Sequence, residues 1–223
     1  VSLIIFFLIF KPKVNLKKNF KVQIIRSILM VTATSFMFYS LQKFDLVDIY
    51  VVFFTAPLIV SLLSAYFLKD ILSTKGILLM LLSFGSIVYS LGPSMRIFSL
   101  DLIFPIVPPI CWALYQFFTK VVSGDNDPFA AIFYTSILGA IIFSIFIFFN
   151  WVPLEKNIFW FYLVILGVAG FVSHSLIIYA IQLSNLSFVT NFQYSQLVWS
   201  TIINFLIFGV PFDYNKIIGV IGI

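Results

Sequence analysis

His174 is the only histidine of the chain, and it lies within a long apolar stretch. An imidazole, with an ordinary pKa of about 6.5, exchanges a proton near neutral pH, which makes His174 a candidate proton-linked switch. A neutral imidazole that hydrogen-bonds a neighbouring helix explains the same residue equally well. Ser173 and Ser175 adjoin it, but consecutive helical residues point about 100° apart, so they do not form a nucleophile and base pair with it.

The residue types give little support for a metal site, a phosphate-binding loop or a catalytic site. One His and one Cys cannot supply a His/Cys metal cage, and no glycine-rich phosphate loop occurs. No carboxylate lies in the middle of a complete apolar run, since Asp48, Asp70 and Asp101 fall in loops or near segment ends. We therefore predict no catalytic residue, no metal and no cofactor. An intramembrane enzyme is kept as an alternative function class.

Polar and aromatic side chains recur at helical spacing on four apolar segments. On the segment 186–208, for example, Ser187, Asn191 and Tyr194 share one face. Such stripes are explained either by hydrogen bonds that join helices or by a wet cavity, and the convergence of several stripes favours the cavity. The cavity is predicted to be lined by Tyr39, Trp112, Tyr115, Gln116, His174, Tyr179, Asn191, Tyr194 and Trp199.

The composition indicates the solvent around these segments. Hydrophobic residues make up 62% and charged residues 9% of the 223 positions, and the mean hydropathy is +1.14. Soluble domains have roughly 45–50% apolar and about 25% charged residues. The apolar runs are about twenty residues long, which suits membrane-spanning helices and not the ~10-residue alternating strands of a membrane barrel. The net charge of +5 is modest, and we predict no nucleic-acid partner.

The predicted fold is therefore an all-α membrane bundle. Residues 1–10 and 217–223 are expected to be parts of two further spans, so that the chain is truncated at both ends. Seven complete spans are expected at 22–41, 46–68, 74–93, 98–122, 129–151, 157–183 and 186–208.

Proline predicts where these helices are irregular. Pro105, Pro108 and Pro109 fall in one span, where each removes a backbone donor, so we expect a kinked or partly unwound helix beside the cavity. Pro57 predicts an interruption of the span 46–68. The small side chains that follow it, such as Ser61, suit close helix contact.

Loop charges predict the orientation. Nine of the 13 Lys and Arg residues, Arg26 among them, are assigned to the side of the basic segment 11–21, which the positive-inside rule makes cytoplasmic. Lys120, near a helix end on that side, is expected to extend its amine to the interface and not to bind solute. Trp151 and Trp160 are expected in an aromatic belt.

An internal repeat is visible when the sequence is shifted by 140 positions. The shift places Ser35 on Ser175, Tyr39 on Tyr179 and a Gln three residues later on another Gln. Five spans separate the two copies, so the second copy enters the membrane from the opposite side. Such inverted repeats are typical of secondary transporters, whose sites lie near the repeat interface.

Several short motifs follow one another in a fixed order. The first group is RSILMVTATSFMFYSLQ, FTAP, LKDILSTKG and Gly92–Pro93; the second is Gly170 with His174, YSQLVW, and FG followed by a Pro and an Asp. Together they resemble the two halves of the EamA branch of the drug/metabolite transporter superfamily. The resemblance implies ten helices in two inverted five-helix repeats, here 1–93, lacking its first helix, and 98–223. Where the family usually has Glu after FLG or FG, this chain has Asp70 and Val210, so no role of that acid is transferred.

The predicted function is a secondary transporter or exporter that moves a small polar or amphipathic metabolite by alternating access. Few charges are expected at membrane depth, so a neutral, zwitterionic or aromatic solute is favoured over a multiply charged phosphate. A flippase for a lipid-linked carrier is the alternative of the same architecture. The predicted partners are the solute and the lipid bilayer, with a homodimer left open, and the resemblance implies a bacterial cytoplasmic membrane.

Overall fold

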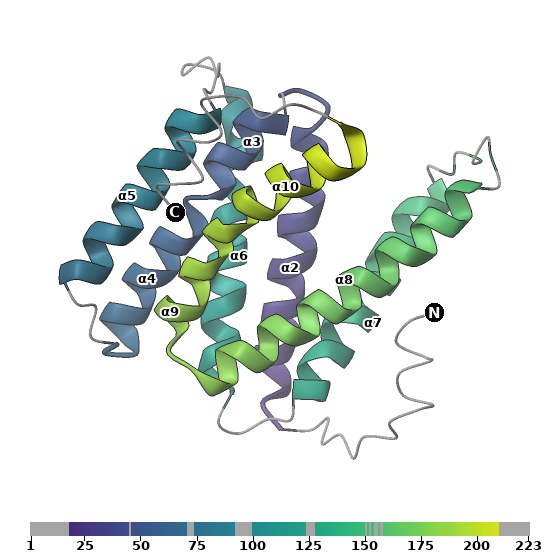
Figure 1. The fold of residues 1–223 in the computed structure, drawn as a ribbon. Helices are drawn as coiled ribbons and strands as arrows, with labels where there is room; N and C mark the ends of the chain where they lie inside the picture. Colours follow the sequence, from purple (N-terminus) through teal and green to yellow (C-terminus); the bar gives the residue numbers. More distant parts are fainter. Residues whose placement is uncertain are drawn as a thin grey trace. The chain divides into compact units, whose positions relative to one another are not determined.

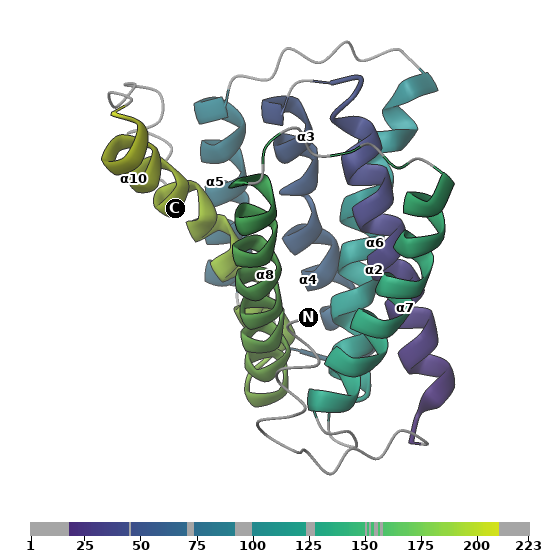
Figure 2. The same cartoon turned by 90° about the vertical axis from the view of Figure 1, so that its right-hand side faces the viewer.

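The computed structural model describes residues 18–44, 46–70, 74–91, 100–123, 128–149, 151, 153, 156 and 158–209. Every regular element among these residues is a helix (Figures 1 and 2). In chain order they are α2 (Phe20–Ser40), α3 (Leu46–Phe53), α4 (Ala56–Phe67), α5 (Thr74–Leu91), η1 (Leu100–Leu102), α6 (Ile103–Val121), α7 (Pro128–Phe149), α8 (Ile158–Leu183), α9 (Leu186–Asn191), η2 (Phe192–Ser195) and α10 (Gln196–Phe208).

The all-helical prediction is confirmed, and the helix ends fall within a few residues of the predicted spans. Four segments of the described part are long and apolar enough to cross a membrane: Phe20–Ser40, Asp48–Phe67, Ala130–Phe149 and Ile158–Leu183. The partial spans predicted at 1–10 and 217–223 lie outside the described residues.

Lipid is the natural surrounding of the second half of α7 and the first half of α8, because most of the apolar side chains there are exposed. Every residue of α8 from 158 to 169 is exposed, and Phe148 near the end of α7 is 81% exposed. Contiguous apolar surface of this extent is rare on soluble monomers.

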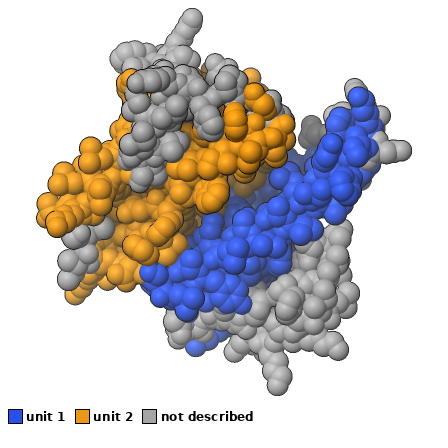
Figure 3. All heavy atoms as spheres, viewed as in Figure 1, with its two compact units in different colours: residues 1–31, 118–184 blue, residues 32–117, 185–223 orange. Residues whose placement is uncertain are grey.

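The chain divides into two compact units, coloured separately in Figure 3. Unit 1 consists of Val1–Val31 and Phe118–Ser184, and unit 2 of Thr32–Phe117 and Asn185–Ile223. The helices α2 and α6 each contribute to both units. This division leaves the predicted repeats 1–93 and 98–223 untested, because the repeats were inferred from sequence symmetry and not from compactness.

In unit 1, Arg26 is fully buried. Its guanidinium donates to Thr119 Oγ1 at 3.2 Å, to Thr135 Oγ1 at 3.0 Å and to the carbonyl oxygen of Ala131. These bonds tie the first half of α2 to the end of α6 and to α7. Arg26 therefore lies within a helix and not in a loop, and the orientation inferred from the charge count stays a prediction.

The C-terminal end of α8 is capped by a side chain from α6. Lys120 Nζ donates to the carbonyl oxygens of Ile181 at 2.9 Å and Ser184 at 2.6 Å. The last carbonyls of a helix have no partner inside the helix. A cation near them also interacts favourably with the negative end of the helix dipole. The amine thus has protein partners at the end of α8, and its expected place at the membrane interface stays a prediction.

In unit 2, the segment from α3 to α4 is interrupted where proline predicted it. Phe54 and Thr55 form a turn between the two helices, and Pro57 stands in the first turn of α4, where its missing N–H costs no helical hydrogen bond. α4 then packs closely against α9. The buried side chains Ser61, Ser64 and Ser187 are small enough for this approach, as predicted for α4.

The second interrupted segment was not predicted. The run 186–208 is divided into α9, the 3₁₀ turn η2 and α10. The 140-residue shift places the interruption at Phe54–Thr55 on the last two residues of η2, Tyr194 and Ser195. The two predicted copies are thus broken at equivalent points.

Of the two alternatives predicted for the proline segment of α6, the unwound helix was wrong, and the kinked helix stays a prediction. α6 remains helical through Pro108 and Pro109, and Pro105 lies in its first turn. The two internal prolines still deprive the carbonyl oxygens of Phe104 and Pro105 of their usual N–H partners four residues ahead.

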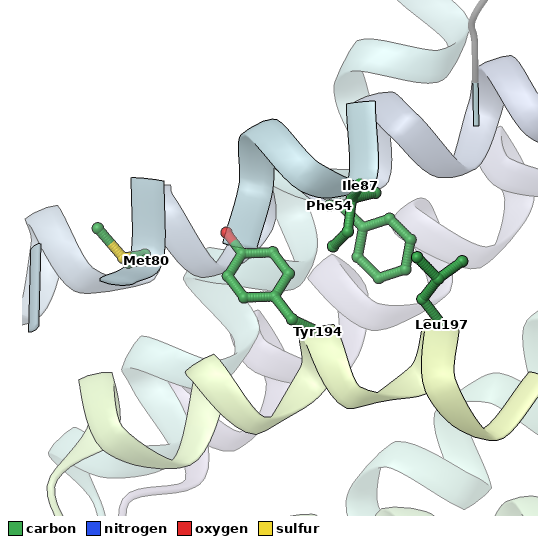
Figure 4. Packing of buried hydrophobic residues seen from close by; sticks show 5 residues of the cluster. All are labelled: Phe54, Met80, Ile87, Tyr194 and Leu197. Atoms are coloured by element: carbon green, nitrogen blue, oxygen red, sulfur yellow. The ribbon is translucent and has the colours of Figure 1, made fainter. Parts of the chain in front are cut away.

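A hydrophobic cluster joins the two interrupted segments and α5. It comprises Phe54, Met80, Ile87, Tyr194 and Leu197, all at most 7% exposed. Figure 4 shows Tyr194 and Leu197 projecting from η2 and α10 toward Phe54, and the rings of Phe54 and Tyr194 lie 6.1 Å apart. These two residues occupy equivalent positions under the 140-residue shift.

Candidate solute-binding site

The inward face of α6 supplies the first wall of the candidate site in unit 2. Tyr115 and Gln116 are 1% and 0% exposed, and Trp112 is partly buried. The Trp112 ring stacks on Tyr115 with centroids 5.4 Å apart and lies 6.1 Å from Phe53 at the end of α3. The predicted stripe on this helix thus faces the protein and not the lipid.

A chain of hydrogen bonds connects α6 with η2. Trp112 Nε1 donates to Gln193 Oε1 at 3.4 Å, and Gln193 Nε2 donates to Gln116 Oε1 at 3.0 Å. Both groups of the Gln193 amide are thereby used, which fixes its orientation. None of the three side chains in this hydrogen-bond network is charged. Its central residue, Gln193, was not among the residues predicted to line the cavity.

Gln193 was missed because the stripe was traced with ideal α-helical spacing. In the 3₁₀ turn η2 there are 3.0 residues per turn and not 3.6, so the face that points inward changes there. The polar type of Gln193 within an apolar run was the available signal.

Five polar atoms on α4, α6, α9 and η2 are buried without a hydrogen-bond partner among the described residues. A buried polar group that lacks a partner costs about 1–3 kcal/mol, so such groups mark places where a solute or water completes the bonding. They are Gln116 Nε2, the Tyr194 hydroxyl, Asn191 Oδ1, Ser61 Oγ and Ser187 Oγ.

Two hydroxyls of the same stripe are satisfied locally. Thr190 Oγ1 donates to the Ser187 carbonyl at 3.2 Å, and Thr201 Oγ1 donates to the Leu197 carbonyl at 2.8 Å. Bonds of this kind to the preceding turn need no solute. These two threonines therefore fit a packing role.

Tyr39 and Trp199 lie apart from the network on α6 and η2. Tyr39, 42% exposed, contacts Phe104, which precedes Trp112 by eight residues and hence by about 12 Å along the helix. Trp199, on α10, is 61% exposed. The assignment of either residue to the cavity stays a prediction.

His174 and Tyr179 belong to α8 in unit 1, so their contribution to a site in unit 2 stays a prediction. His174 is partly buried, and Tyr179 is 36% exposed. The two explanations offered for His174, a proton-linked switch and a structural hydrogen bond, both stay open.

The acid at the end of α4 has a structural partner. Asp70 accepts a hydrogen bond from the Ser64 hydroxyl, and its own N–H donates to the Ser64 carbonyl at 3.3 Å. The intervening Lys69 has a φ of 55°, the left-handed conformation that often ends a helix. Val210, its counterpart in the motif comparison, lies outside the described residues.

No group of three His, Cys, Asp or Glu side chains that could hold a metal occurs in the described part of the chain. Long apolar helices, two interrupted segments and an uncharged polar network are features that polytopic membrane transporters share.

The comparisons with known proteins identify the family. The profile of the EamA-like transporter family matches residues 1–92 and 100–223. The chain therefore belongs to the EamA-like transporter family and is a multi-pass membrane protein of the drug/metabolite transporter type.

The fold comparison agrees with this assignment. A solved structure described only as "Crystal structure of protein" superposes with a TM-score of 0.83 at 15% identity, over 99% of this chain and 79% of the other. At this identity the likeness concerns the fold alone. No curated protein matches the chain.

Proposed function

We propose that the chain is a secondary transporter that moves a small, uncharged or zwitterionic solute with an aromatic or amphipathic part. The observation that carries this proposal is the network of Trp112, Gln193 and Gln116, together with the unsatisfied polar atoms of α4, α6, α9 and η2. Amide and hydroxyl groups bind a solute's donors and acceptors, and the Trp112 face offers a stacking surface.

The lack of charge around the network supports the solute class. No Lys, Arg, Asp or Glu occurs in α4, α9, η2 or α10, or in α6 from Ile103 to Phe117, and α3 carries a single buried acid, Asp48, in its first turn. A multiply charged phosphate would need cationic partners to offset its desolvation. Arg26 and Lys120 donate to protein oxygens in unit 1, so neither is offered as a solute ligand.

Alternating access between two inverted repeats, 1–93 and 98–223, is the proposed mechanism. The 140-residue shift relates α3 to α9 and α4 to α10. It therefore relates the pair α4 and α9 to the pair α10 and α3. α4 packs closely on α9, whereas α3 and α10 do not approach to a similar extent. Such inequality between equivalent pairs supports a state closed at one membrane face and open at the other.

With the cytoplasmic face assigned from loop charges, α4 and α9 lie in the cytoplasmic half of their segments. The closed end is then cytoplasmic, and the open end faces the opposite side. A bacterial cytoplasmic membrane completes the proposal, and a homodimer is left open.

The test is counterflow in liposomes that contain the purified chain. Amino acids, nucleosides and amines are screened as solutes, and Gln116→Leu is compared with Gln42→Leu, which changes the same side-chain type at an exposed turn position. We expect uptake of at least one uncharged or zwitterionic solute, reduced at least tenfold by Gln116→Leu only.

Other outcomes identify the alternatives. Movement of a lipid-linked sugar without movement of any free solute would replace the transporter by a flippase. A chemically altered product would indicate an intramembrane enzyme.

A further inference from the structure

The end of α2 and the start of α6 form a small aromatic and acidic cluster in unit 2, which we call the outer cluster. It consists of Tyr39, Lys43, Asp101 and Phe104. Lys43 Nζ lies 2.6 Å from Asp101 Oδ1, 5.7 Å from the centre of the Tyr39 ring and 5.1 Å from the centre of the Phe104 ring. One ammonium group thus has three favourable neighbours.

The aromatic part of the outer cluster is held by protein packing and not by the lysine. The Tyr39 and Phe104 rings are 4.5 Å apart, and Phe36 lies 5.9 Å from Phe104 on the same side of α2. Asp101 belongs to the 3₁₀ turn η1, which leads directly into α6. The acid and the two rings are therefore carried by elements that do not include Lys43.

These neighbours are those that recognise an organic ammonium group. The faces of aromatic rings attract cations within about 6 Å of the ring centre, and a carboxylate supplies a charged hydrogen-bond acceptor. Two rings and an acid together provide the chemistry of an ammonium site, which the chain's own lysine occupies.

Lys43 is suited to leave this site. It stands on the turn after α2, its side chain is 35% exposed, and Asp101 is 48% exposed. Ion pairs at such exposure are weak because water and salt screen them and two long side chains lose freedom. The flexible four-carbon stem can swing into solvent without moving the helices.

We propose that the outer cluster is a binding site for the primary ammonium group of an alkyl or aryl amine, with Lys43 as a tethered competitor. The site lies about 18 Å along α6 from Gln116, by the helical rise over the twelve residues from Phe104. It is distinct from the uncharged network and does not depend on transport.

Lys43 remains a competitor over the whole physiological pH range. Its hydrogen bond with Asp101 raises the pKa of Lys43 above the ordinary value of 10.5. A base with a raised pKa stays protonated below that value, so the tethered ammonium is present from pH 6 to pH 8. Binding of an outside amine to the unaltered chain is accordingly weak throughout that range.

The test measures binding of 4-fluorobenzylamine to the full chain in lipid nanodiscs by fluorine NMR. Lys43→Met removes the ammonium but keeps an unbranched stem, and we expect it to tighten binding at least fivefold. Lys69→Met, which removes the same charge from another exposed loop, should leave binding unchanged. Asp101→Asn combined with Lys43→Met should abolish the gain.

Three results would overturn the proposal: no gain in Lys43→Met, a gain that survives Asp101→Asn, or an equal gain for the uncharged 4-fluorobenzyl alcohol. Lys43→Gln serves as a second variant of different shape and must show the same gain. Circular dichroism and gel filtration establish that each variant is folded before it is compared.

Discussion

At the scale of single residues, the centre of the candidate site is an amide. Gln193 accepts from Trp112 and donates to Gln116, so it links the two polar positions of α6 to η2. Water is scarce within a bilayer. A donor or acceptor that loses its partner in this hydrogen-bond network therefore finds few other partners.

We predict that Gln193→Leu lowers the free energy of unfolding by about 1–3 kcal/mol, because Trp112 Nε1 and Gln116 Oε1 lose this partner. A double-mutant cycle with Gln116→Leu should show a coupling of about 0.6 kcal/mol, the average for hydrogen bonds between membrane helices. Reversible unfolding in detergent measures both values. The control is Gln196→Leu, an exposed glutamine three residues farther along. Strict additivity of the two central changes would show that the amides do not interact.

Residue types alone predicted part of this site. Trp112, Tyr115 and Gln116 were identified because their spacing puts them on one α-helical face, and the structure buries that face. Gln193 escaped because its 3₁₀ turn alters the angular spacing. Arg26 was counted among loop charges, since sequence alone does not show that Thr119 and Thr135 lie within hydrogen-bond distance.

At the scale of helices, the contact between α4 and α9 depends on small side chains. Ser61 is fully buried on α4, and its hydroxyl has no hydrogen-bond partner among the described residues. The size and the polarity of Ser61 therefore have separate consequences. The small volume permits close packing, whereas the buried hydroxyl adds no hydrogen bond to the protein.

We predict that Ser61→Ala leaves thermal stability unchanged or raises it slightly, whereas Ser61→Leu lowers the free energy of unfolding by about 1–3 kcal/mol through overpacking. Leu62→Ala is the matched control, since that neighbour is 68% exposed. Thermal unfolding of the purified chain in detergent compares the three variants. A stable Ser61→Leu protein would mean that close approach of α4 and α9 is not needed.

Some helix boundaries follow from the sequence and others do not. Apolar run length placed the spans correctly, and Pro57 predicted the turn at Phe54–Thr55. The prolines of α6 did not unwind the helix, because a helix tolerates lost donors when its surroundings stabilise it. The η2 turn contains neither Pro nor Gly, so the local sequence did not predict an interruption of the helix there.

At the scale of the molecule, the proposed mechanism requires two pairs of half-segments to open and close in turn. The pair α4 and α9 is closely packed, and the equivalent pair α3 and α10 is not. A ligand shifts such an equilibrium only if it binds the two states with different affinity.

We predict opposite distance changes in the two pairs during turnover. Spin labels at Tyr66 and Phe188 report on α4 and α9, and labels at Leu46 and Leu206 report on α3 and α10; all four positions are at least 55% exposed. Cys111, the only cysteine, is first replaced by serine. With a transported solute, the first distance should gain a longer population and the second a shorter one in double electron–electron resonance. Changes in the same direction in both pairs would contradict alternating access.

The bonds of Arg26 also set an order of events during synthesis. Its partners Thr119 and Thr135 follow it by 93 and 109 residues. At about 5–20 residues per second, the ribosome needs roughly 5–20 seconds to make them. During that interval α2 carries a guanidinium that must reach water or lipid headgroups, since an isolated charge is costly at membrane depth. The final depth of α2 is therefore reached only when the first half of α7 has been made, so the first described helix settles later than its place in the chain suggests.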